Sequence, residues 1–117
     1  MMKYTGNCHC KKVAYEVELD LSGGVLNCNC SYCSAQGLLL AFAPKEKLNI
    51  ISGADNLTTY KFNKHVLDHM FCKDCGNQPF SFGNNPSGVS TVAVNVRTIN
   101  GIDQESLKKN FYDGKKI

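Results

Sequence analysis

Seven cysteines in three tight groups carry the most specific chemical signal in this sequence. The groups are Cys8 and Cys10 in NCHC, Cys28, Cys30 and Cys33 in NCNCSYC, and Cys72 and Cys75 in FCKDCG. An odd number cannot pair fully within one chain, and a disulfide between residues two positions apart would close a strained ring. In a reducing compartment, such clusters are typical of metal binding or catalysis. We therefore interpret all seven cysteines as metal ligands.

The first and last groups together supply a complete structural site. A Cys-x-x-Cys turn directs two sulfurs toward one ion, and Gly76 provides the permissive backbone that commonly follows such a turn. A Cys-x-Cys pair supplies two more ligands if alternate residues of a strand face the same side, so that His9 faces away. Four thiolates are the usual donor set of closed structural zinc, with a rubredoxin-like iron site as the alternative. The predicted ligands are Cys8, Cys10, Cys72 and Cys75.

The middle group has one ligand fewer, and three protein ligands with an open position are typical of catalytic zinc. Three thiolates make zinc a weak Lewis acid, which disfavours water activation and favours a further sulfur ligand. The spacing therefore predicts a catalytic zinc that binds a substrate thiol. Two alternatives stay open: His65 or His69 completes the site, or no metal binds there. The predicted catalytic ligands are Cys28, Cys30 and Cys33.

Short strands and turns must position these groups. The stretch VAYEVEL, residues 13–19, alternates apolar and polar residues and predicts a half-buried strand. Further strands are expected over residues 25–28, 38–43, 57–62, 65–71 and 89–96. Helical turns are expected within residues 31–37, 44–48 and 103–117, the last followed by a short tail. The predicted fold is mainly β, with antiparallel sheets, short helical turns, zinc knuckles and no long amphipathic helix.

Length and composition favour one globular domain over residues 1–117, with 43% apolar and 20% charged residues. No apolar run approaches the roughly 20 residues that cross a bilayer, and no stretch resembles a signal peptide, so a cytoplasmic location and no membrane contact are expected. The formal charge of +3 would fall to zero with seven thiolates and two zinc ions, and the lysines are scattered. Nucleic-acid binding is therefore unlikely.

The motifs TGNCHCKKVAYEVE, NCNCSYC, FCKDCGNQPF and VAVNVRTINGID with YDGK occur in an order that resembles the glutathione-dependent formaldehyde-activating enzyme family, which includes centromere protein V. The resemblance spans nearly the whole chain. It implies an Mss4-like β fold with two zinc ions per chain, structural at the outer cysteines and catalytic at the middle group. It also implies a carbon–sulfur lyase activity that joins formaldehyde to glutathione. Asn29 and Ser34 depart from the family pattern, which often has His and Arg there.

Other residues suggest contacts with a glutathione-like substrate. Arg97, the only arginine, could bind a substrate carboxylate in bidentate fashion, the alternative being a surface or strand-end salt bridge. His65 and His69 could carry protons near neutral pH.

Two other functions were considered. A methionine sulfoxide reductase of type B would need a nucleophilic cysteine late in the chain, and none follows Cys75. The remaining alternative is a non-catalytic zinc module that binds protein or nucleic acid.

Overall fold

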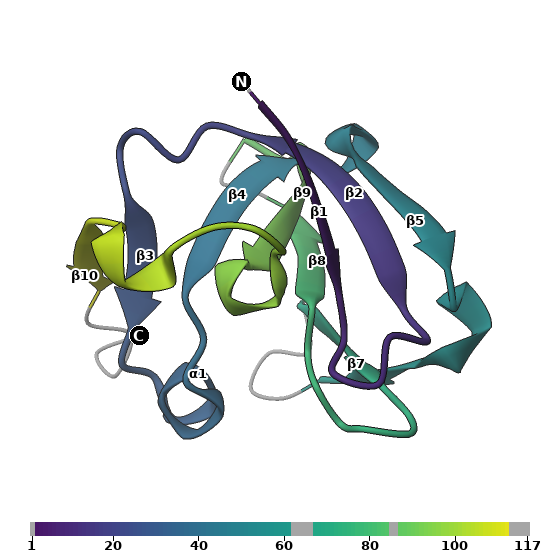
Figure 1. Cartoon of the computed structure of the whole chain (residues 1–117). Helices are drawn as coiled ribbons and strands as arrows, with labels where there is room; N and C mark the ends of the chain where they lie inside the picture. Colours follow the sequence, from purple (N-terminus) through teal and green to yellow (C-terminus); the bar gives the residue numbers. More distant parts are fainter. Residues whose placement is uncertain (1, 62–66, 85–86, 113–117) are drawn as a thin grey trace.

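The computed structural model describes residues 2–61, 67–84 and 87–112. Two β-sheets dominate this part of the chain, with strand orders β1-β2-β5 and β10-β3-β4-β9-β8-β7-β6 (Figure 1). The strands are β1 (Met2–Asn7), β2 (Ala14–Leu19), β3 (Val25–Cys28), β4 (Leu40–Pro44), β5 (Leu48–Ser52), β6 (Leu57–Tyr60), β7 (Asp68–Cys72), β8 (Phe80–Asn84), β9 (Ser90–Asn95) and β10 (Lys109–Tyr112). The mainly β prediction is confirmed.

The main hydrophobic core lies between the two sheets. On β2, Tyr15, Val17 and Leu19 are buried while the glutamates between them are half-buried, as the alternation predicts. These side chains pack against buried residues of the larger sheet, and the ring of Tyr15 meets Phe80 edge to face at a centroid distance of 5.6 Å. Burial of this apolar surface is the main force that holds the two sheets together.

The helical elements are short. They are α1 (Ser31–Gln36) and the 3₁₀ turns η1 (Lys45–Lys47), η2 (Ala54–Asn56), η3 (Val96–Thr98) and η4 (Gln104–Ser106). A six-residue helix has little stability of its own, so α1 depends on caps and packing. Its N-cap is Cys30, and it ends at Gly37 in the left-handed conformation, with φ at 68°. Within the described ranges, no helix combines the length and apolarity needed to cross a membrane.

Four strands were not expected from the sequence: β1, β5, β8 and β10. Their local patterns lack clear alternation, and β10 forms only through a distant parallel pairing in which Lys109 lies opposite Val25. The larger sheet is therefore mixed, although its other pairings are antiparallel, as expected. The predicted strand over residues 65–71 begins at Asp68, and its first two residues lie outside the described part of the chain. Phe42, within the expected strand over residues 38–43, is 54% exposed, because it faces away from the core.

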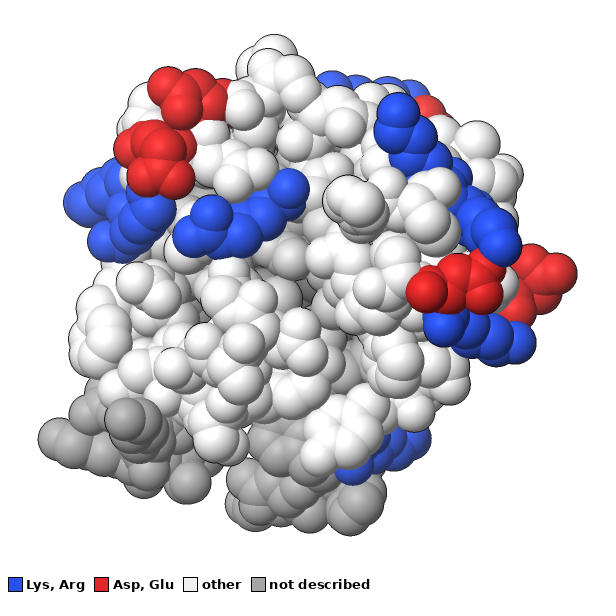
Figure 2. Space-filling view, turned by 60° about the horizontal axis from the view of Figure 1, so that its bottom comes forward, with Lys and Arg blue, Asp and Glu red and all other residues white. Residues whose placement is uncertain are grey.

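One end of the molecule gathers the segments that carry the cysteines. In Figure 1, α1 and the turn between β1 and β2 both lie at the bottom, near β7. Figure 2 brings this end forward: the visible Lys, Arg, Asp and Glu side chains lie mostly toward the margins, and much of the surface between them is uncharged. The fold thus presents both cysteine groups on one side of the core.

We expect Gly53→Ala to lower the free energy of unfolding by about 2–4 kcal/mol, the sum of left-handed strain and overpacking. Gly53 has a φ of 81°, and a Cβ there would lie 2.1 Å from the backbone oxygen of Lys12. Chemical denaturation would measure the change. Gly23→Ala is the matched control, because a Cβ there meets nothing within 4 Å. An unchanged denaturation midpoint for Gly53→Ala would contradict the close approach of Gly53 to the backbone of Lys12.

Candidate metal centres and the adjoining depression

The outer cysteines converge as the sequence predicted. The four Sγ atoms of Cys8, Cys10, Cys72 and Cys75 all lie within 4.8 Å of one another. Cys10 Sγ lies 3.6 Å from Cys8 Sγ and 3.5 Å from Cys72 Sγ. The group joins the turn after β1 to the turn after β7, segments more than sixty residues apart in sequence. It therefore ties the small sheet to the large one.

The expectation that strand alternation brings the sulfurs of a Cys-x-Cys pair together is wrong. Neither Cys8 and Cys10 nor Cys28 and Cys30 lie together on one strand. Strand β1 ends at Asn7, and Cys8 closes a tight turn in which its backbone N–H donates to Val13 O at 3.0 Å. Lys11, with a φ of 69°, gives this turn its left-handed residue. In the middle group, β3 ends at Cys28 and Cys30 already caps α1. Turn geometry, rather than strand alternation, brings these sulfurs together.

Two residues next to the outer cysteines, His9 and Gly76, lie as the sequence predicted. His9 is exposed and lies outside the sulfur group. Gly76 has a φ of 74°, and its N–H donates to Cys72 O at 2.9 Å, which closes the Cys-x-x-Cys turn. A non-glycine residue would be strained in that left-handed conformation.

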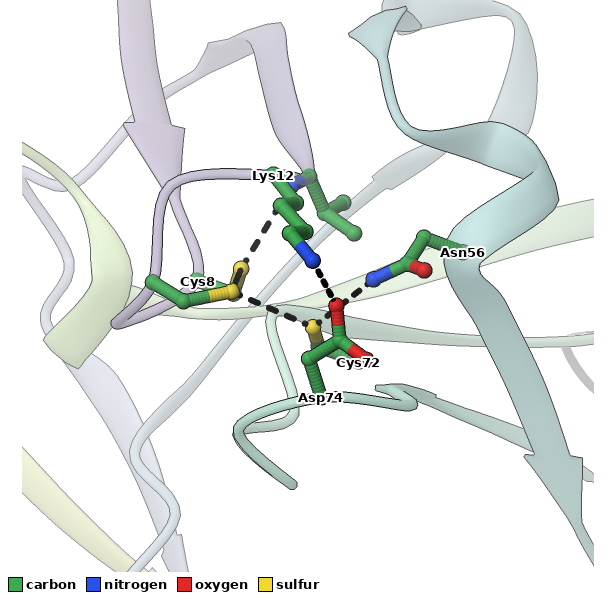
Figure 3. A network of polar contacts seen from close by, with 7 residues as sticks. Cys8, Lys12, Asn56, Cys72 and Asp74 are labelled. Carbon is green, nitrogen blue, oxygen red and sulfur yellow. Dashed lines mark hydrogen bonds and ion pairs between the residues drawn. The ribbon is translucent and has the colours of Figure 1, made fainter.

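Hydrogen bonds from nearby N–H groups support the outer sulfurs (Figure 3). Val13 N donates to Cys8 Sγ at 3.4 Å, and Asn56 Nδ2 donates to Cys72 Sγ at 3.2 Å. Although burial opposes it, hydrogen bonds from the backbone of Cys10 and neighbouring groups lower the pKa of Cys75 to about 6. Such donors favour thiolates, the form in which cysteine binds metal. Beside them, Lys12 forms an ion pair with Asp74.

The middle group is equally compact. The sulfurs of Cys28, Cys30 and Cys33 lie within 4.8 Å of one another, with the first and last of these residues buried and Cys30 half-buried. Backbone N–H groups again point at sulfur: Cys30 N donates to Cys28 Sγ at 3.4 Å, and Cys33 N donates to Cys30 Sγ at 3.3 Å. Burial opposes ionisation of Cys30, but the hydrogen bond from Cys33 N helps to lower the pKa of Cys30. Burial raises the pKa of Cys33.

Both donor sets fit a thiolate-binding metal. Every cysteine is a free thiol, and the sulfur separations of 3.5 and 3.6 Å in the outer group exceed the roughly 2.05 Å of a disulfide bond. Zinc–sulfur bonds of about 2.3 Å in a tetrahedron place the sulfurs about 3.8 Å apart, close to the distances in the outer group. The two clusters therefore could hold metal ions, and their chemistry is consistent with zinc, although four thiolates also suit iron.

Neither cluster includes a histidine among the residues that the structure describes. His69, considered as a fourth ligand of the middle group, is buried, and its ring packs against Tyr32 with centroids 4.3 Å apart. Burial lowers the pKa of His69, which favours its neutral form. His65, the other candidate, lies outside the described residues. The three sulfurs thus stand without a fourth protein ligand in the described ranges.

The Tyr32 side chain connects the two sites. It lies on α1 between two cysteines of the middle group, and its hydroxyl donates to Gln78 Oε1, just after the Cys-x-x-Cys turn. Its ring also stacks on Tyr60 of β6 at a centroid distance of 5.6 Å. These contacts fix the short helix against the β6–β7 hairpin that ends at Cys72. The position of the middle group therefore depends on contacts with the segments that carry Cys72 and Cys75.

A surface depression of about 220 Å³ opens beside the middle group. None of its lining residues, all within the described ranges, carries a carboxylate. Five of its lining residues were singled out from the sequence: Cys28, Cys33, Asn29, Ser34 and Arg97. Lys109 also lines the depression, but the sequence did not point to it. Lys109 reaches the depression only because β10 pairs with β3, and no local sequence pattern signals that pairing.

These features define a class: a two-sheet β protein with a closed four-cysteine group and a three-cysteine group beside a surface depression. The family model described as glutathione-dependent formaldehyde-activating enzyme matches residues 3–112, and the chain belongs to this family. The present chain is similar to the crystal structure of a Rhodobacter sphaeroides protein, with 31% sequence identity and a TM-score of 0.81. That similarity covers 92% of this chain and 99% of the other. The resemblance inferred from the motifs and the fold class are both confirmed.

Proposed function

We propose that this protein is a zinc-dependent carbon–sulfur lyase that joins a small thiol, such as glutathione, to formaldehyde. One observation carries the proposal: three sulfurs converge without a fourth protein ligand in the described ranges, and two of these cysteines, Cys28 and Cys33, line a depression large enough for a small molecule. Membership of the glutathione-dependent formaldehyde-activating enzyme family supports the choice of thiol and aldehyde.

Each cysteine group has a separate role in this proposal. Zinc at the outer group would be structural, since its four sulfurs complete a tetrahedral donor set. Cys28, Cys30 and Cys33 would hold the second ion. When bound there, zinc would supply an open position that accepts a thiolate, and three thiolate ligands make a further sulfur a suitable partner.

The chain itself would contribute orientation and a shielded surface. The backbone N–H groups of Cys30 and Cys33 fix the positions of the sulfurs, and the Tyr32 contacts hold α1 in place. Leu38 and Leu39 form an apolar part of the depression wall. Holding a deprotonated thiol close to the aldehyde lowers the entropic part of the barrier.

The reaction balances without another co-reactant. The thiol sulfur forms a bond to the aldehyde carbon, the carbonyl π bond breaks, and the aldehyde oxygen takes up the proton that the thiol has lost. The product is the S-hydroxymethyl adduct, and the reverse reaction breaks the same carbon–sulfur bond. No oxidant or reductant is needed.

Exchange NMR of glutathione, formaldehyde and their adduct at equilibrium tests this function. The zinc-loaded protein is expected to raise the exchange rate above the uncatalysed rate, and Cys28→Ser is expected to remove that increase. Leu21→Ala, a substitution outside the depression lining, serves as a control for general effects of mutation. An exchange rate that the zinc-loaded protein leaves unchanged would refute the lyase activity.

A further inference from the structure

We propose that Arg97 and Lys109 form an anion subsite that makes the depression selective for thiols bearing a carboxylate. This inference rests on the proposed thiol-binding function and adds a determinant of substrate choice. The two side chains come from different elements, η3 and the start of β10, and both line the depression together with Cys28 and Cys33.

Both cations lack an acidic partner in the described part of the chain. The ion pairs found there involve other lysines, namely Lys3, Lys12, Lys47 and Lys61. The surface salt bridge considered for Arg97 is therefore absent from the described residues. Two cations without an ion-pair partner in the described ranges, at one depression without lining carboxylates, favour an anionic ligand.

Neutral oxygens hold the two cations in place. Arg97 Nε donates to Gly37 O at 2.8 Å, and one of its terminal nitrogens donates to Gln104 Oε1 at 3.4 Å. Lys109 Nζ donates to Gln104 O at 3.2 Å and to Leu107 O at 3.3 Å. Because Gln104 contacts both, the 3₁₀ turn η4 sets their relative position. Neutral acceptors thus orient both side chains without forming an ion pair.

The contact between Arg97 and Gly37 links this subsite to the sulfur group. Gly37 ends α1, the helix that contains Cys33 and is capped by Cys30. A carboxylate bound by Arg97 is thus anchored to the same short element that positions two of the sulfurs. Guanidinium groups bind carboxylates through paired hydrogen bonds, whereas lysine adds a point charge. A thiol with a carboxylate would match both parts of this surface.

Two probes of nearly equal size separate charge from thiol binding: 3-mercaptopropionate and the neutral 3-mercapto-1-propanol. Titration of the cobalt-substituted protein, followed by sulfur-to-cobalt charge-transfer absorption, gives a Kd for each. Since both cations are exposed and partly screened by solvent, Lys109→Gln is expected to reduce the relative preference for the carboxylate thiol by about threefold to tenfold. Comparing the ratio of the two Kd values between variants cancels the intrinsic difference in thiol acidity.

Lys108→Gln is the matched control, because it removes the same charge from a neighbouring exposed residue that does not line the depression. Lys109→Arg should retain the preference, since it keeps the charge. Arg97→Gln should lower the preference as Lys109→Gln does, and adding salt should weaken it in the wild-type protein.

Two outcomes overturn the subsite, and they differ in what they say about the proposed function. If both thiols bind but Lys109→Gln and Arg97→Gln leave the Kd ratio at its wild-type value, the subsite is refuted while thiol binding stands. If neither thiol changes the cobalt spectrum of the wild-type protein, the thiol-binding function fails and the subsite fails with it.

Discussion

Replacing Cys72 by alanine is expected to leave the protein unfolded at room temperature. Cys72 is fully buried at the end of β7, opposite Leu57, and its sulfur lies 3.5 Å from Cys10 Sγ. The outer group connects the turns of both sheets, so the metal-binding energy that it provides is also folding energy. For structural zinc that energy is about 10–16 kcal/mol in small domains, comparable with or larger than the roughly 5–15 kcal/mol stability of an ordinary domain.

Circular dichroism and thermal unfolding of Cys72→Ala, with metal analysis of the same sample, would measure this effect. His9→Ala is the control, because His9 lies within the same Cys-x-Cys motif but is exposed and outside the sulfur group. The control is expected to keep the wild-type melting temperature. A Cys72→Ala protein that melts cooperatively near the wild-type temperature would contradict a structural role for the outer group.

Replacing Cys30 by alanine is expected to have a different result: the protein folds but loses one metal ion and its response to thiols. Cys30 is half-buried and belongs to the group beside the depression, away from the main core. Its side chain also caps α1, so a modest loss of about 1 kcal/mol in the free energy of unfolding is expected. A site left with two sulfurs would not retain its ion.

Metal analysis, thermal unfolding and the glutathione–formaldehyde exchange assay on one preparation would test this expectation. Ser31→Ala is the matched control, since Ser31 is the next residue, is exposed and offers no thiol. It should retain both metal content and exchange activity. A Cys30→Ala variant that still accelerates the exchange would show that the middle group is not the catalytic centre.

The two cysteine clusters could be predicted from the sequence because cysteine spacing encodes local turn geometry. The strongly alternating strand β2 was predictable for a related reason: its pattern records which face meets the core. The turns that hold Cys8 and Cys10 were harder, since a Cys-x-Cys pair is compatible with both a strand and a turn. Here the hydrogen bond between Cys8 N and Val13 O selects the turn.

The wall of the depression could be predicted only in part. Asn29, Ser34 and Arg97 lie near recognisable motifs, whereas Lys109 belongs to a strand whose four residues are all exposed. Its place depends on the parallel pairing of β10 with β3 across more than eighty residues, and local propensity carries no information about such a pairing. Charge selectivity of the site is therefore a property of the assembled fold.

X-ray absorption at the zinc edge of the wild-type protein tests the central claim most directly. Four sulfurs in one group and three in the other predict an average of about 3.5 sulfurs per ion without substrate. Saturation with glutathione should raise that average to about 4, since the added thiolate completes the second donor set. An average that stays constant at every glutathione concentration would contradict a thiol-binding metal at Cys28, Cys30 and Cys33.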